Sequence, residues 1–119
     1  MFIDLVDIEW CYRARQFGAA CYGICDARMH HVLGDAPSSI FGRPVAQRMP
    51  LRHFYLFRNT VLLFGRRYVP WAWKCSEAVK LLARFGINAL FRAPRWAGVR
   101  MMTAGIWHGL RGISGPYRA

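Results

Sequence analysis

The chain has 119 residues, which is enough for one domain at most. A hydrophobic fraction of 55% excludes a disordered chain, yet no apolar run approaches the roughly 18–20 residues of a membrane-spanning helix. The formal net charge of +11 indicates an anionic partner, such as nucleic acid, acidic lipid head groups or a diphosphate-bearing substrate.

The charges are distributed unevenly along the chain. Five of the six acidic residues lie within the first 35 positions, and the sixth is Glu77. We therefore predict two parts. Residues 1–50 form a segment with an acidic motif and a loop, and residues 51–119 form a basic, aromatic-rich helical tail.

The first predicted element is a helix over residues 6–18. Asp7 can cap its start, and Gly18 supplies a stop at its end. Residues 20–25 and 27–31 are short apolar stretches, for which we predict a pair of edge strands. Residues 34–50 are rich in Gly and Pro, which predicts a loop of the length that functional lids often have.

The tail is predicted to contain three helices, over residues 51–67, over residues 71–86 and from Pro94 onward, where proline takes its preferred first-turn position. Residues 71–86 show the clearest amphipathic pattern. The predicted apolar face comprises Trp71, Cys75, Ala78, Val79, Leu82 and Phe85, and the opposite polar face comprises Ser76, Glu77, Lys80 and Arg84. The fold class is therefore α+β, mostly α.

A stripe of glycines and four cysteines complete the pattern. Gly98, Gly105 and Gly109 share one side of the third tail helix, where another helix could approach closely. The cysteines have no C-x-x-C spacing and follow no signal peptide, so we interpret them as reduced, mostly buried residues of a cytosolic protein. A metal site built from Cys21, Cys25 and His30 or His31 would lack a fourth ligand.

The most informative residues are the two acids at the start of the first helix. Asp7 and Glu9 stand two positions apart in apolar surroundings. Because a helix N-terminus favours carboxylates, both could simply stabilise the helix. A catalytic or metal-binding role is the alternative, and the spacing alone leaves both open.

The wider pattern resembles the family 2 glycosyltransferases, particularly the rhamnosyl- and galactofuranosyltransferases of bacterial surface polysaccharides. The resemblance starts with F-I-D-x-V-D-x-E-W-C-x-R-A-R-x-x-G at residues 2–18. It continues with A-x-x-x-H-x-L-G at residues 27–34, L-R-H-F-Y-L-F-R-N at residues 51–59 and G-L-R-G-I-S-G-P at residues 109–116. It therefore covers most of the chain, in order.

This resemblance implies roles for individual residues. Asp7 would be the general base that deprotonates the acceptor hydroxyl in an inverting transfer, and Glu9 and Trp10 would contribute to acceptor binding. His31, with His30 as a weaker rival, would help to hold a divalent ion, Mg or Mn. The alternative to a metal-binding role for His31 is a solvent-facing loop histidine.

Arg58, and with a weaker case Arg52, would contact phosphate of the donor or of a lipid-linked acceptor, because a guanidinium matches phosphate oxygens. Arg58 turns toward the apolar side of its helix. Its alternative role is therefore to pack its stem against that side while its charged head reaches water.

The resemblance also implies what the chain does not contain. Transferases of this GT-A-type fold bind the sugar nucleotide with an N-terminal nucleotide-binding domain and a D-x-D motif, and this sequence has no D-x-D. We therefore expect a C-terminal fragment, inactive alone, of an enzyme that uses a dTDP-rhamnose-like donor and a glycan or lipid-linked acceptor.

Tryptophans and arginines interleave in the tail, a mixture that suits an anionic membrane surface as well as core packing. We thus expect a cytoplasmic protein, peripheral on the inner face of the cell membrane. The alternative to an enzyme is a small basic protein that binds membrane surfaces or nucleic acid. No recognised nucleic-acid-binding module supports a nucleic-acid-binding protein, and we expect no nucleic-acid partner.

Overall fold

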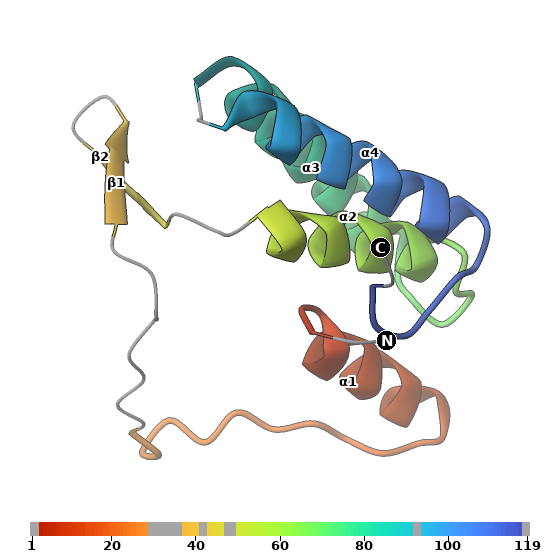
Figure 1. Cartoon of the computed structure of the whole chain (residues 1–119). Helices are drawn as coiled ribbons and strands as arrows, with labels where there is room; N and C mark the ends of the chain where they lie inside the picture. Colours follow the sequence, from red (N-terminus) through yellow and green to blue (C-terminus); the bar gives the residue numbers. More distant parts are fainter. Residues whose placement is uncertain (1–2, 29–36, 41–42, 47–49, 92–93, 118–119) are drawn as a thin grey trace.

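Four helices form most of the described chain, which comprises residues 3–28, 37–40, 43–46, 50–91 and 94–117 of a computed structural model (Figure 1). The helices are α1 (Val6–Gln16), α2 (Pro50–Phe64), α3 (Trp71–Phe91) and α4 (Arg95–Leu110), and the strands are β1 (Pro37–Ile40) and β2 (Arg43–Ala46). This confirms the prediction of a mostly helical chain with three tail helices. The GT-A-type fold of a complete transferase stays a prediction.

Helix α2 lies at the centre of the helical part, between α1 on one side and α3 with α4 on the other (Figure 1). Its residues 53–60 are all buried, including His53 and Asn59. Helical spacing puts these two residues on the polar side of α2, which would face solvent if only the apolar side were covered. The structure buries both sides over residues 53–60, because neighbouring segments cover that part of the helix.

Helices α2 and α4 pack closely because α4 carries glycine at the contact. A Cβ atom added to Gly105 would lie 2.5 Å from the Phe54 carbonyl oxygen, and one added to Gly109 would lie 2.7 Å from Val61 Cβ. Gly98 has open space around it instead. The predicted glycine stripe is thus confirmed at two of its three positions.

The apolar core lies where α2, α3 and α4 meet. Phe57, Leu81 and Met102, one from each helix, form a buried cluster, and Phe85 packs against it with its ring edge-on to that of Phe57 at 6.2 Å. Among the described residues, no helix has the length and hydropathy needed to cross a bilayer.

Helix α3 is rotated about its axis relative to the prediction, although Phe85 of the predicted apolar face does pack against the core. Its buried residues are Glu77, Leu81 and Asn88. Four residues of the predicted apolar face are exposed instead: Trp71, Cys75, Val79 and Leu82. The pattern correctly identified a helix, but the face assignment is wrong.

Burial of Glu77 is possible because two cations of the same helix neutralise it. Lys80 Nζ lies 2.8 Å from one carboxylate oxygen, and Arg84 Nη1 lies 3.5 Å from the other. A buried carboxylate is costly unless it is paired, and this helix supplies both partners one turn and two turns away. Glu77 can therefore face inward while Lys80 and Arg84 stay partly exposed.

The strand prediction is also corrected. Residues 20–25 form no strand and are exposed, since nothing in the described chain pairs with their backbone. Of residues 27–31, only the first two are described, and they are irregular. An antiparallel pair lies instead within the predicted loop, with Pro37 opposite Ala46 and Ile40 opposite Arg43. A two-stranded ribbon has only edge strands, which tolerate proline.

Replacing Gly105 with alanine should destabilise the protein by about 1–3 kcal/mol, because the new methyl group would overlap the Phe54 carbonyl. Urea unfolding followed by circular dichroism measures this change. The matched control is Gly98→Ala in the same helix. Its methyl group meets open space, so it should be neutral or stabilising by up to about 1 kcal/mol. Equal effects of both substitutions would contradict the close α2–α4 approach.

Candidate functional site

The segment before α1 is bound to α2 by one buried side chain. Asn59 Nδ2 donates hydrogen bonds to the carbonyl oxygens of Ile3 at 2.6 Å and of Asp4 at 2.9 Å. Ile3, Asp4 and Leu5 all have left-handed backbone conformations, with φ of 52°, 49° and 63°. Such a conformation costs about 1–2 kcal/mol per residue outside glycine. Asn59 therefore holds a strained turn that sets the direction of α1.

Arg52 reinforces this attachment from the first turn of α2. Its guanidinium lies 3.4 Å from Asp4 Oδ1, and the Asp4 side chain is only 12% exposed. The residue predicted to contact phosphate is thus placed beside the acidic motif, where it forms an ion pair with the motif's first carboxylate. The phosphate contact itself stays a prediction.

Asp7 is exposed in the first turn of α1. The N-cap residue is Leu5, and no side chain caps the helix, so the predicted capping by Asp7 is wrong. In the part of the chain that the structure describes, the Asp7 carboxylate makes no hydrogen bond or ion pair. The geometry leaves this carboxylate available to an external group.

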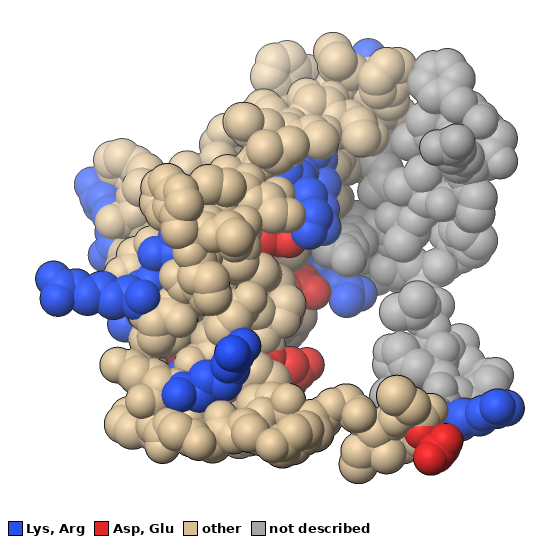
Figure 2. Space-filling model, turned by 180° about the vertical axis from the view of Figure 1, so that it is seen from behind, with Lys and Arg blue, Asp and Glu red and all other residues tan. Residues whose placement is uncertain are grey.

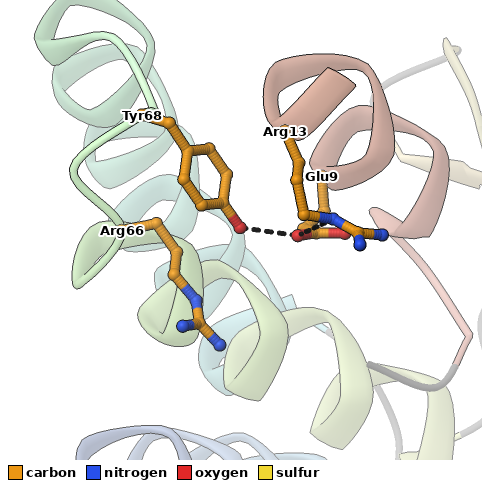
Figure 3. Close-up of a pocket in the computed structure, with 4 residues that line it drawn as sticks. All are labelled: Glu9, Arg13, Arg66 and Tyr68. Carbon is orange, nitrogen blue, oxygen red and sulfur yellow. Dashed lines mark hydrogen bonds and ion pairs between the residues drawn. The ribbon is translucent and has the colours of Figure 1, made fainter. Parts of the chain in front are cut away.

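Glu9, in contrast, is held in place. Its Oε1 accepts a hydrogen bond from the Tyr68 hydroxyl at 2.5 Å and one from Arg13 Nε at 3.1 Å. These three residues and Arg66 line an open pocket of about 350 Å³. Figure 3 shows Glu9 and Arg13 reaching in from α1 toward Tyr68 and Arg66, which follow the end of α2.

The pocket is polar and carries more positive than negative charge, with two guanidinium groups and one carboxylate. Burial raises the pKa of the Tyr68 hydroxyl, and the hydrogen bond to Glu9 raises it further, so the phenol stays a donor. A carboxylate, a phenol and guanidinium groups together can bind hydroxyl groups and anions.

Sequence reasoning did not identify Tyr68 or Arg13. Arg13 stands one helical turn after Glu9, and this spacing could have indicated the ion pair. Tyr68 lies 59 positions from Glu9 in the sequence, so no local pattern connects the two residues.

Arg58 lies deep inside the molecule, at 1% exposure, which rules out the alternative in which its charged head reaches water. Its Nη1 donates to the Gly115 carbonyl at 2.7 Å, and its guanidinium lies 5.0 Å from the centre of the Tyr55 ring. Burial lowers its pKa. In this arrangement Arg58 binds the C-terminal segment, and its contact with phosphate stays a prediction.

The remaining predicted site residues have different placements. Trp10 is 58% exposed on α1, so its indole can receive a ligand. His30 and His31 lie outside the described residues, and the described residues contain no group of three His, Cys, Asp or Glu side chains that could hold a metal ion. The metal ligand therefore stays a prediction.

The predicted burial of the cysteines is wrong, because Cys21, Cys25 and Cys75 are exposed and Cys11 is half-buried. All four are free thiols. A hydrogen bond with Cys21 raises the pKa of the Cys11 thiol, and desolvation raises it further. The Cys11 thiol is therefore not poised as a nucleophile.

Replacing Tyr68 with phenylalanine should cost about 1 kcal/mol of stability, through loss of the hydrogen bond to Glu9. Because the folded protein raises the phenol's pKa, its stabilising contribution is full below about pH 10 and is lost as the pH rises through the folded value. In an alkaline titration, the absorbance step at the highest pH, which we assign to ionisation of Tyr68, should therefore be absent from the Tyr68→Phe variant. Tyr22→Phe, at an 87% exposed position, is the control and should leave that step unchanged.

Replacing Asn59 with alanine should release α1 selectively, because the strained turn loses both of its side-chain donors. Relative to the unchanged protein, hydrogen exchange should accelerate at least about tenfold more for the amides of α1 than for those of α4. Thr60→Ala is the control. It removes an equally buried polar group, whose hydrogen bond runs to Leu56 within α2, so α1 and α4 should respond alike. A uniform response to Asn59→Ala would contradict this role.

Comparison with known proteins identifies a similarity to a rhamnosyl transferase. The chain is 30% identical, over 118 residues, to the dTDP-rhamnosyl transferase RfbF of Shigella flexneri. The match covers 99% of this chain and 40% of that protein, so the chain spans less than half the length of its relative. No family model matches the chain, and no solved structure matches it.

Proposed function

We propose that this chain carries the catalytic base and part of the acceptor site of a glycosyltransferase that transfers rhamnose from a dTDP-rhamnose-like donor to a glycan or lipid-linked acceptor. The observation that carries this proposal is the contrast between the two acids of α1. Asp7 is exposed and has no partner among the described residues, whereas Glu9 is fixed half a turn further on in a polar pocket. Similarity to a rhamnosyl transferase over almost the whole chain supports it.

In the proposed reaction Asp7 accepts the proton of the acceptor hydroxyl. The oxygen of that hydroxyl forms a bond to the anomeric carbon, while the bond from that carbon to the nucleotide diphosphate breaks on the opposite side, and the configuration inverts. A carboxylate within hydrogen-bond reach of the hydroxyl suits this role. Asp7 needs no rearrangement to be reached, because nothing within the described chain engages it.

The acceptor sugar would lie against Glu9 and Trp10. Glu9 is oriented by Tyr68 and Arg13, so it can accept a hydrogen bond from a sugar hydroxyl without itself having to become ordered. Trp10 offers an exposed indole on which the apolar face of a sugar ring can rest. Arg66 gives the pocket a cation for phosphate.

The proposed reaction also includes a divalent ion. When bound, it would neutralise the diphosphate leaving group, and His31 is the residue of this sequence that we assign to it. The donor-binding D-x-D motif is absent from the sequence. We therefore expect transfer to require the nucleotide-binding domain that such a motif belongs to, and the chain alone to be inactive.

The test is a chimera in which this chain replaces the matching segment of the Shigella flexneri relative. With dTDP-rhamnose as donor, Asp7→Asn should lower kcat by about 10²–10⁴-fold, because the amide cannot accept the proton. Donor affinity should change less than about twofold, since Asp7 acts on the acceptor. Radiolabelled rhamnose transfer and calorimetric donor binding measure the two quantities.

The control for this experiment is Asp26→Asn. It makes the same chemical change at an exposed position outside α1, and it should leave kcat unchanged. A chimera that folds and binds donor, but keeps its turnover when Asp7 is replaced, would remove Asp7 from the mechanism.

A further inference from the structure

The outward face of α3 carries a continuous apolar stripe that the fold leaves uncovered. Trp71, Val79, Leu82 and Leu90 are 76%, 68%, 75% and 64% exposed. At 100° per residue they lie on one side of the helix, opposite the buried Glu77. With a rise of 1.5 Å per residue, the stripe is roughly 28 Å long. It is long enough to be an interaction surface in its own right.

The surface around this stripe is cationic. Residues 51–119 contain 12 Lys and Arg and a single acid, Glu77, whereas residues 1–50 contain five of each sign. Glu77 is buried and paired with Lys80 and Arg84, so it offsets one of these charges and leaves a large positive excess. On the face in Figure 2, Lys and Arg side chains project from several places on the helical part.

Exposed arginines lie near both ends of the stripe. Arg67 precedes Trp71 in the chain, and Arg95 follows shortly after Leu90. The partner that complements an apolar stripe bordered by cations is itself apolar and anionic. A second copy of this chain would place cations against cations, so charge disfavours self-association through this face.

We propose that the outward face of α3 docks on an anionic lipid surface, with the helix lying in the plane of the membrane. Val79 and Leu82 would enter the acyl boundary, the indole of Trp71 would lie at head-group level, and the arginines would meet lipid phosphates. The described helices do not span a bilayer, which agrees with this in-plane arrangement.

The docked orientation keeps the candidate site accessible. Helix α1, which carries Asp7 and Glu9, contacts α3 through the packing of Tyr12 on Trp73, and Trp73 lies on the side of α3 opposite the apolar stripe. Contact through the outer side of α3 would not cover the acidic residues. This inference depends on exposure and charge alone, and it holds or fails independently of the proposed transfer reaction.

The experiment measures binding of the 119-residue chain to sedimented vesicles. Vesicles of equal parts phosphatidylglycerol and phosphatidylcholine should bind it at least about tenfold more strongly than vesicles of phosphatidylcholine alone. Binding should weaken as salt is raised. The double variant Val79→Ser/Leu82→Ser should bind the anionic vesicles at least about tenfold less strongly. Both residues are exposed, so the folded helices should be retained, as circular dichroism checks.

The matched control is Phe17→Ser/Ile24→Ser, which removes two equally exposed apolar side chains near α1. It should change vesicle binding less than about twofold. Brominated lipids should quench tryptophan fluorescence less when Trp71 is replaced by phenylalanine. Absence of binding to anionic vesicles, or equal losses in both double variants, would overturn the proposal. So would a dimer in sedimentation velocity that Val79→Ser/Leu82→Ser abolishes.

Discussion

Two adjacent buried residues of α2 hold both ends of the described chain. Asn59 binds the carbonyls of Ile3 and Asp4 before α1, and Arg58 binds the carbonyl of Gly115 after α4. Both side chains are almost fully buried, so each polar group needs its partner, and loss of either partner would cost more than a surface contact. The central helix therefore fixes the chain's geometry through polar contacts that its apolar neighbours keep dry.

This attachment explains why α1 can present its acids outward. None of the residues of α1 is fully buried, so apolar burial contributes little to its position. The helix is held instead at its entry by Asn59, and along its length by the contact of Glu9 with Tyr68 and by the edge-on packing of Tyr12 on Trp73. Apolar burial of α1 would have removed its carboxylates from the surface. Polar attachment engages Glu9 alone and leaves Asp7 exposed, without a partner in the described chain.

The sequence predicted those features that depend on local spacing. The tail helices followed from their apolar period, and the α2–α4 contact from the small residues Gly105 and Gly109. The pairing of Tyr68 with Glu9 was not predictable, since it joins residues that only the fold brings together. The pairing of residues 37–40 with residues 43–46 was missed because proline and glycine there indicate a loop, yet edge strands tolerate proline.

The face of α3 was missed for a reason that links its packing to its surface. The apolar pattern predicts that the stripe from Trp71 to Leu90 turns inward, which would leave Glu77 outside among the cations. The observed rotation buries Glu77 between Lys80 and Arg84 instead. It thus removes the tail's one acid from the surface in the same step that exposes the stripe. Exposure of the apolar stripe and burial of Glu77 are therefore two consequences of one orientation of the helix. The rotation that buries the stripe would expose the carboxylate.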